Sequence, residues 1–410
     1  MSDKINAKPT AKTVKFKDRQ AALNERRNLK MARSAHAYVR GNTQKFYEWL
    51  ESAGGKKLPH GPPIWICGDC HLGNLGPLGN TKGRVEVQIR DLDQTVIGNP
   101  SHDLIRLALS LASAARGSDL PGVTTAQMLE EIMHGYTAAF TLLKKGKREE
   151  IEVPEALAKA LEDSVKRSWK HLAQERIEDT KPDIPLGKTF WPLTAEEKKE
   201  VKNLFEKDAV RRLVTALKSR DDDARITVRD AAYWRKGCSS LGKLRYAVLL
   251  EIEGAKGEKS EYTLIDIKEA GPAVAPRNKR TKMPRDNGER VITGAKHLSP
   301  YLGDRMLAER FGDKSVFLRE LMPQDLKTDL EHLTREEATR VARYLANVVG
   351  KGHARQMDEA TRNSWLAELK RDRSGKLDAP SWLWTSTVEL IVSHEAAYLE
   401  HCRRYALGKK

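Results

Sequence analysis

Residues 65–76 read WICGDCHLGNLG and place two cysteines, a histidine, an aspartate and an asparagine within a few positions of one another. The apolar residues at the start of this stretch are typical of a buried strand that runs into a loop. Polar side chains at such a junction can serve metal binding, nucleophilic catalysis or the handling of phosphate. The rest of the chain distinguishes these three possibilities.

The two cysteines have the spacing of half a zinc site. No second half completes the pair Cys67 and Cys70, because Cys238 and Cys402 are isolated and no histidine pair joins them. A redox role would need a thiolate stabilised at a helix start, whereas this pair lies in a predicted buried strand. We therefore expect two small buried thiols, with structural zinc or redox chemistry as the alternative.

Carboxylates and an amide recur at a spacing that suits phosphoryl transfer. Asn74 follows Asp69 by five residues, and Asp91 and Asp93 come at the end of the next predicted strand, 83–93. Phosphoryl transfer needs one carboxylate to orient the acceptor, and an amide oxygen with a further carboxylate to hold Mg²⁺. A loop whose Asp, His and Asn side chains cap turns is the equal alternative.

A further acid precedes a long apolar segment. Asp103 follows Asp91 by twelve residues and stands directly before residues 104–115, which predict a buried helix closed by Gly117. An acid at the start of a helix can accept amide hydrogens from a neighbouring loop. We predict that Asp103 supports the catalytic loop and takes no part in the chemistry.

Strand patterns separated by glycine turns fill about a hundred residues from Arg225 onward. Within them, KGCSSLGKLRYAVLLE (236–251) is a glycine-containing turn that enters a strand, and such a turn can cover phosphates with its amides. The next strand, YTLIDIKEA (262–270), carries Lys268 near its end, as does the strand that clamps phosphates in kinases. A solvated lysine at the edge of a sheet is the alternative.

The chain as a whole predicts an α+β protein. We expect a disordered basic tail over 1–14, a helical lobe with the catalytic and metal loops over 15–224, a β-rich nucleotide lobe over 225–330, and helices returning to the helical lobe over 331–410. Within the first lobe, residues 15–51 are expected to be helical.

The chain has a formal net charge of +16, and residues 1–45 supply more than half of it with 12 Lys+Arg against 3 Asp+Glu. This excess permits binding to polyanions or small anions, and a solvated surface with a flexible basic tail also explains it. The basic residues are not interleaved with aromatic residues that could stack on bases, so the sequence does not favour nucleic acid as a partner. No apolar run predicts a secretory signal or a membrane span, and four cysteines make no disulfide framework, so we expect a cytoplasmic protein.

Several ordered motifs resemble one bacterial family. CGDCHLGNLG, IRDLDQTVIGNPSHDLIRLALSL, GCSSLGKLRYAVLLE and LIDIKEA together resemble the uncharacterised bacterial family called domain of unknown function 2252, over roughly residues 20–360. That family in turn resembles the protein-kinase-like superfamily, especially the aminoglycoside and choline phosphotransferases. Those enzymes carry a G-D-x-H-x-x-N catalytic loop and a later I-D-x-x-D metal segment.

The resemblance implies a two-lobed, kinase-like fold that uses ATP and Mg²⁺. By this resemblance, Asp69 would be the base that orients the acceptor. Asn74 and Asp91 would be magnesium ligands, with Asp93 as a possible second acid ligand. Lys268 would contact the α- and β-phosphates. The phosphate loop would comprise Gly237, Ser239 and Gly242.

Two features depart from an ordinary kinase. The catalytic segment precedes the glycine turn and Lys268, whereas an ordinary nucleotide lobe comes first, so we expect a circular permutation. Arg90 stands directly before Asp91, although strand alternation should point its side chain away. Kinases also pair this lysine with a glutamate, for which Glu269 and Glu309 are both candidates.

Together these features predict an ATP- and Mg²⁺-dependent phosphotransferase that acts on a hydroxyl or amine of an unknown small molecule or protein. A catalytically inactive kinase-like protein that binds a nucleotide or a partner is the alternative, and a nucleic-acid-associated protein is a more remote one. If one Mg–nucleotide contacts both groups, Lys268 and Asp91 must lie within about 10 Å of each other.

Overall fold

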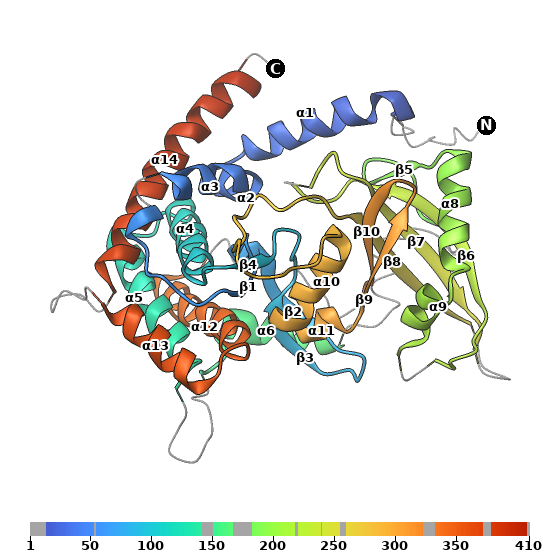
Figure 1. The fold of residues 1–410 in the computed structure, drawn as a ribbon. Helices are drawn as coiled ribbons and strands as arrows, with labels where there is room; N and C mark the ends of the chain where they lie inside the picture. The colour runs from blue at the N-terminus through green and yellow to red at the C-terminus, as the bar shows by residue number, and fades with distance from the viewer. Residues whose placement is uncertain are drawn as a thin grey trace, which may run out of the picture.

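The structure is a computed structural model that describes residues 14–52, 55–141, 151–166, 183–217, 220–238, 240–254, 260–322, 333–371 and 379–407. Except for its last residue, the expected disordered tail over 1–14 lies outside these ranges. A group of helices and a six-stranded antiparallel sheet stand side by side (Figure 1). The α+β class expected from the sequence is therefore confirmed.

The helical part is built around α4 (Ser101–Gly117), which is buried on almost every side. The prediction of a buried helix over 104–115 is therefore confirmed. Among the described residues, no helix combines the length and the apolar character needed to cross a bilayer. The other helices of this part are α1 (Arg19–Met31), α2 (Ala35–Gly41), α3 (Thr43–Glu51), α5 (Gly122–Ala138), α6 (Glu155–Lys166), α12 (Arg335–Ala354), α13 (Glu359–Lys370) and α14 (Ser381–Tyr405).

Residues 15–51, expected to be helical, are divided among α1, α2 and α3 by two capping residues. Ser34 caps α2 by accepting a hydrogen bond from the amide of Ala37, and Asn42 caps α3 by accepting one from the amide of Lys45. Short polar side chains at these positions satisfy the first amides of a new helix and so interrupt the preceding one.

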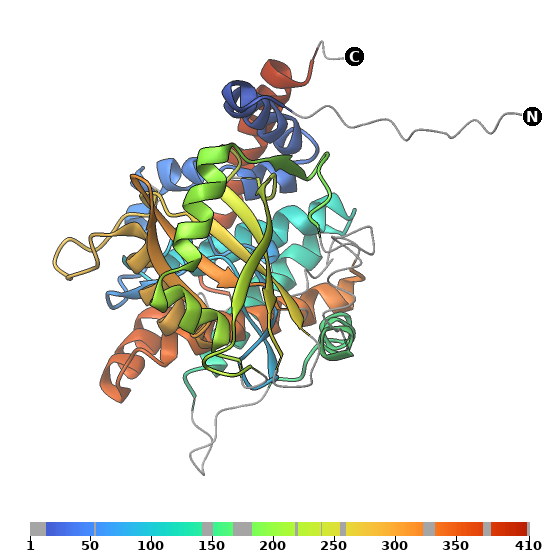
Figure 2. The ribbon, with the colours of Figure 1, turned by 90° about the vertical axis from the view of Figure 1, so that its right-hand side faces the viewer.

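The large sheet has the strand order β5-β6-β7-β8-β10-β9, and every neighbouring pair is antiparallel. Its strands are β5 (Phe190–Pro192), β6 (Ile226–Trp234), β7 (Arg245–Ile252), β8 (Glu261–Glu269), β9 (Met306–Phe311) and β10 (Lys314–Glu320). Side chains alternate between the two faces. On β10, Val316 and Leu318 join the core beneath α8 (Ala195–Phe205) and α9 (Asp208–Thr215), whereas Phe317 joins the core of the helical part. Figure 2 shows α8 and α9, in green, in front of the sheet.

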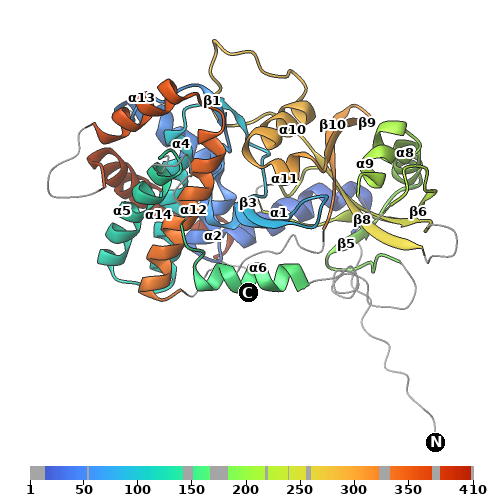
Figure 3. The same cartoon turned by 90° about the horizontal axis from the view of Figure 1, so that it is seen from below.

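Two small sheets connect the helical part to the large sheet. Strand β1 (Ile64–Ile66) pairs with β4 (Val96–Gly98), and β2 (Leu75–Gly79) pairs with β3 (Val85–Ile89). In Figure 3 the β2–β3 hairpin, in blue, lies between α12 and the large sheet. The loops that follow β1 and β3 therefore begin at the junction of the two parts.

The large sheet differs from the expected β-rich segment at both ends. It begins before residue 225, because β5 pairs with β6 and because α8 and α9 complete the core on one face. The segment 225–330 also contains two helices that the sequence patterns did not indicate, α10 (Asn287–Leu298) and α11 (Pro300–Gly303). These helices contact β1 and β2, so they fill the junction between the sheet and the helical part.

Helix α1 spans from the large sheet to the helical part along the upper edge of Figure 1. At its first end, Leu23 belongs to the core of the sheet, and Arg19 forms an ion pair with Glu197 of α8 at 2.8 Å. At its other end α1 contacts α14, where Nε2 of His401 lies 2.9 Å from the carbonyl oxygen of Asn28. Helix α1 therefore ties the two parts of the molecule together.

Acid should destabilise the protein through His394 of α14, whose side chain is buried. Burial and the positive charge of Arg106 lower the pKa of this imidazole to about 3. Below about pH 6.5 the unfolded chain binds a proton there that the folded protein does not, so the free energy of unfolding falls. Between pH 6.5 and 5 the share of His394 in this loss should be on the order of 1–2 kcal/mol, measured by urea unfolding as the difference between the wild type and His394→Gln. His394→Gln should reduce this slope and His60→Gln, at an exposed position, should not; equal slopes in all three proteins would contradict it.

Candidate functional site

Asp103 at the start of α4 holds the loop that follows β1. Its buried carboxylate accepts from the amide of Cys67 at 2.7 Å and from the amide of Gly68 at 2.9 Å. His353 of α12 contacts the same group, with Nε2 3.1 Å from Oδ2. Three partners offset the cost of removing this charge from water. Asp103 therefore supports the loop after β1, as predicted.

The hydrogen bonds of His353 continue into the core of the helical part. The hydroxyl of Tyr136 lies 2.9 Å from Nδ1, and the indole of Trp365 donates to the Tyr136 oxygen at 3.0 Å. Because an indole only donates, the Tyr136 proton is directed to Nδ1, and the imidazole carries its own proton on Nε2, toward Asp103. Burial raises the pKa of Tyr136 above its ordinary value, which keeps the phenol proton in place. The tautomer of His353 is thus set by its neighbours.

The loop after β3 packs against the loop after β1 at Gly68. This glycine has a φ of 75°, and a Cβ atom added to it would lie 2.1 Å from the carbonyl oxygen of Gln94. Glycine alone fits both the backbone conformation and this approach. The thiol of Cys67 lies 3.7 Å from the carbonyl oxygen of Asp91. The expected catalytic and metal loops are therefore in direct contact.

Asp69, the expected catalytic base, is 6 % exposed and has a partner at each oxygen. Oδ1 accepts from Nε of Arg106 at 2.8 Å, and Oδ2 accepts from the hydroxyl of Thr43 at 2.8 Å. A carboxylate has about four acceptor positions, so each oxygen keeps one for a further donor. The side-chain amide of Asn74 donates to the carbonyl oxygen of Asp69 at 3.0 Å, which keeps these two residues together.

Lys268 of β8 lies between the two acids of the loop after β3. Its Nζ is 3.1 Å from Oδ2 of Asp91 and 2.5 Å from Oδ2 of Asp93, and its side chain is 3 % exposed. A separation of 3.1 Å satisfies the condition that one Mg–nucleotide can contact both Lys268 and Asp91. Residues 177 positions apart in the chain thus form one charged cluster.

Neither glutamate expected beside Lys268 lies there. Glu269 pairs with Lys314 at 2.8 Å, and Glu309 pairs with Lys207 at 2.7 Å. Glu269 is the next residue to Lys268 on β8, so strand alternation turns it to the opposite face. The expectation of a lysine–glutamate pair is therefore wrong, and the two aspartates take that place.

The charges around Lys268 influence one another. Burial alone would raise the pKa of Asp91, but the positive charges of Lys268 and Arg319 outweigh it and hold this pKa below its ordinary value. Burial and the neighbouring charge of Asp91 raise the pKa of Asp93. Oδ1 of Asp93 is buried and has no hydrogen-bond donor among the described residues. A further cation would supply the partner that this buried oxygen lacks.

Asn74 lies at the same end of the β2–β3 hairpin as Asp91. Leu75 pairs with Ile89, and the amide of Arg90 donates to the carbonyl oxygen of Asn74 at 2.7 Å. Within the described ranges no three His, Cys, Asp or Glu side chains form a metal cluster, so a cation here would depend on two carboxylates, the Asn74 amide oxygen and water. Mg²⁺ prefers such hard oxygen donors and retains several waters. The residues present therefore fit magnesium.

The expected phosphate loop is the turn between β6 and β7. Gly237 and Gly242 have φ values of 101° and 105°, which glycine adopts without strain, and Ser239 lies outside the described residues. Lys30 of α1 donates from Nζ to the carbonyl oxygen of Gly237 at 2.8 Å. The turn ends beside the charged cluster, because the first residue of β7 pairs with Lys268.

The family model described as "Uncharacterized protein conserved in bacteria (DUF2252)" matches residues 19–404. The chain belongs to this family. The resemblance to it over roughly 20–360 is therefore confirmed, and the match extends further, through α14. No curated protein and no solved structure matches the chain.

Three arginines that the sequence analysis did not include among the site residues connect the loops of the candidate site. Arg290 of α10 donates to the carbonyl oxygen of Asp93 at 3.0 Å, and Arg319 of β10 donates to that of Arg90 at 3.1 Å. Arg106 of α4 donates to Oδ1 of Asp69. Of the three, only Arg106 could have been predicted from the sequence. It is a single cation inside an apolar helix, and such a cation must find a buried acceptor. Arg290 belongs to a basic stretch that reads as solvated.

The two cysteines of the opening motif are buried thiols in this DUF2252 protein. Cys67 and Cys70 have no exposed surface, and all four cysteines of the chain are free. A hydrogen bond with Cys70 and burial raise the pKa of Cys67 well above its ordinary value. Both observations agree with the expected structural role.

Replacing Asp103 should destabilise the DUF2252 fold. Asp103→Ala leaves two loop amides and His353 without an acceptor in a buried position. The free energy of unfolding, measured with urea, should fall by roughly 3–5 kcal/mol. The control Glu336→Ala breaks an exposed pair with Arg340 and should change it by less than about 0.5 kcal/mol. A loss below about 1 kcal/mol for Asp103→Ala would show that the loop does not depend on this carboxylate.

Proposed function

We propose that this protein is an ATP- and Mg²⁺-dependent phosphotransferase that acts on a hydroxyl or amine. One observation carries the proposal. The ammonium of Lys268 meets Asp91 and Asp93 at 3.1 and 2.5 Å, beside the turn that contains Gly237 and Gly242. A strand lysine next to a metal-binding acid and a glycine turn is the arrangement with which kinases hold the phosphates of a nucleotide.

The proposed roles follow from the position of each group. Amides of the glycine turn and the ammonium of Lys268 bind phosphate oxygens. Asn74, Asp91 and Asp93 would hold Mg²⁺, which would neutralise negative charge on the phosphates. Asp69 orients the acceptor by accepting a hydrogen bond from it. As the bond from the γ-phosphorus to ADP breaks, the bond to the acceptor forms, and the acceptor proton leaves by way of Asp69.

The order of the elements supports a circularly permuted, two-lobed kinase-like fold. A hairpin with a glycine turn (β6 and β7), a strand with a lysine (β8) and a helix (α10) follow one another, as in a kinase nucleotide lobe. The loops with Asp69 and Asp91 come before this unit instead of after it. Helix α10 supplies Arg290 to the site, where the kinase helix supplies a glutamate.

The proposed substrates indicate a compartment as well. A donor such as ATP is abundant in the cytoplasm, where thiols also remain reduced. The four cysteines of the chain are all free. We therefore also propose a cytoplasmic location, with ATP and an unknown phosphate acceptor as the partners.

Nucleotide binding without transfer is the alternative function. The observation that favours it is the state of Asp69, which is 6 % exposed and already paired with Arg106 and Thr43. A base must come within hydrogen-bonding distance of its acceptor, and burial restricts that approach. Both functions require ATP binding, but only the phosphotransferase turns ATP over.

Calorimetric titration with ATP tests the nucleotide site. The wild-type protein should bind ATP more tightly with Mg²⁺ than without it, and Asp91→Asn should remove most of that difference because a charged metal ligand is lost. Lys268→Met should weaken binding about tenfold under both conditions. The control Asp208→Asn changes an exposed acid on α9 and should leave binding unchanged. No binding at millimolar ATP under either condition would reject the proposal.

Turnover separates the phosphotransferase from the alternative. With an acceptor found by screening ADP release, Asp69→Asn should retain Mg–ATP affinity and slow transfer about 10²–10⁴-fold, because the acceptor loses its base. Thr43→Val removes only the hydroxyl partner of Asp69 and should slow transfer much less. Magnesium-dependent ATP binding with a background ADP release that Asp69→Asn leaves unchanged would favour nucleotide binding without transfer.

A further inference from the structure

A group of cations lies where α1 and α2 cover the glycine turn. Lys30 donates to the carbonyl oxygen of Gly237, and a Cβ atom added to Gly41 would lie 3.0 Å from the sulfur of Cys238. Residues 19–41 contain six Lys+Arg and one acid, and residues 235–243 contain three Lys+Arg and no acid. We call the following set the α1 cation cluster: Arg26, Arg27, Lys30, Arg33, Arg40 and Arg235.

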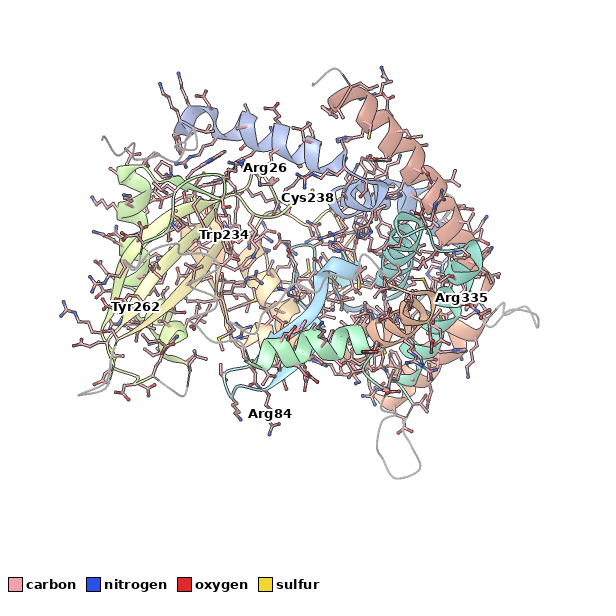
Figure 4. All side chains as sticks on the ribbon, turned by 180° about the vertical axis from the view of Figure 1, so that it is seen from behind. Arg26, Arg84, Trp234, Cys238, Tyr262 and Arg335 are labelled. Carbon is pink, nitrogen blue, oxygen red and sulfur yellow. The ribbon has the colours of Figure 1, made fainter. Side chains whose placement is uncertain are left out.

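Four members of the α1 cation cluster act on the thiol of Cys238. Burial raises the pKa of the Cys238 thiol, and the positive charges of Lys30, Arg40, Arg27 and Arg33 act in the opposite direction. Figure 4 labels Cys238 in the turn and Arg26 on the helix above it. Four cations, two from α1, one from α2 and one from the turn between these helices, therefore lie around the glycine turn.

Arg26 and Arg235 of this cluster lack a counter-charge. The Nε atom of each is buried without an acceptor, and within the described residues neither side chain forms an ion pair. Burial and the charge of Arg26 lower the pKa of Arg235 to about 10, so the two guanidinium groups repel each other. Arg235 is held over the ring of Trp191 at 4.2 Å. Two neighbouring like charges without a carboxylate favour the binding of an anion.

The α1 cation cluster borders the loop of the proposed base. Arg40 lies against Gly73, where an added Cβ atom would be 2.6 Å from Nη2. Gly73 belongs to the same loop as Asp69. An anion bound by the cluster would therefore lie near the group that orients the acceptor, while Lys268 and its two acids are available to the nucleotide.

We propose that the α1 cation cluster binds the acceptor, and that this acceptor is a small molecule that already carries a phosphate group. The inference rests on the proposed function, in which Lys268, Mg²⁺ and the turn amides serve ATP. Arginine forks match the oxygens of a phosphate, and a phosphomonoester of charge about −2 would neutralise Arg26 and Arg235 together. The γ-phosphoryl group would move to a free hydroxyl of that molecule, whose proton leaves through Asp69, and the products would be ADP and a bisphosphate.

Binding of inorganic pyrophosphate to the full chain, without Mg²⁺ or ATP, tests the cluster by titration calorimetry. Arg26→Gln/Arg235→Gln should weaken binding about tenfold or more, since two charge-assisted contacts are lost. Arg26→Lys/Arg235→Lys retains both charges without the paired N–H donors and should restore part of the affinity. The matched control Arg84→Gln/Arg335→Gln removes two exposed arginines, on the β2–β3 turn and on α12, and should bind like wild type (Figure 4). Thermal unfolding verifies that each variant is folded.

Lys268→Met separates this inference from the proposed function, and it should leave pyrophosphate affinity within about twofold of wild type. If Lys268→Met loses pyrophosphate affinity and Arg26→Gln/Arg235→Gln keeps it, the anion binds in the nucleotide site. That result would overturn the inference and leave the proposed function standing. Affinity lost in the Gln pair of a protein that does not bind Mg–ATP would support the anion site and reject the phosphotransferase. No pyrophosphate binding, or tight binding of long nucleic acids alone, overturns the inference.

Discussion

The buried carboxylate of Asp103 is the interaction on which the site depends. It connects the start of α4 to the loop after β1 and, through His353, to α12. A tyrosine of α5 and a tryptophan of α13 extend the same chain of hydrogen bonds, so four helices determine the position of one loop. Asp69 and Asn74 stand on that loop. The residues of the proposed site therefore derive their placement from polar groups buried in the core.

A second buried network joins the loop after β3 to the large sheet. Asp266 of β8 pairs with Arg245 at 2.5 Å and with Arg319 at 3.2 Å, and Arg319 also donates to the carbonyl oxygen of Arg90. Burial alone would raise the pKa of Asp266, but the two arginines outweigh it and hold this pKa below its ordinary value. Asp266 shares its face of β8 with Lys268. The approach of Lys268 to its acids is thus fixed by ion pairs and backbone carbonyls more than by apolar packing.

The sequence was informative where a local pattern also determined a tertiary contact. The apolar segment after Asp103 had to be buried, and an acid at its start had to find donors in an adjacent loop. Strands β6, β7, β8 and β10 have enough alternating residues to be recognised, whereas β5 and β9 are short and are defined by their neighbours in the sheet. The partners of Lys268 could not be read from its own segment, because an ion pair across 177 positions has no periodicity. Strand alternation alone was enough to exclude Glu269 as the partner of Lys268, because neighbouring residues of a strand point to opposite faces.

The contact between α1 and α14 has a consequence for the order in which the protein is made. The hydroxyl of Tyr398 donates to the carbonyl oxygen of Ala32 at 3.2 Å, across 366 positions of the chain. During synthesis α1 leaves the ribosome long before α14, so this partner does not yet exist when α1 emerges. Until then its many cations keep an unpacked helix hydrated and apart from other chains. The contact between α1 and α14 is consequently among the last in the molecule to form.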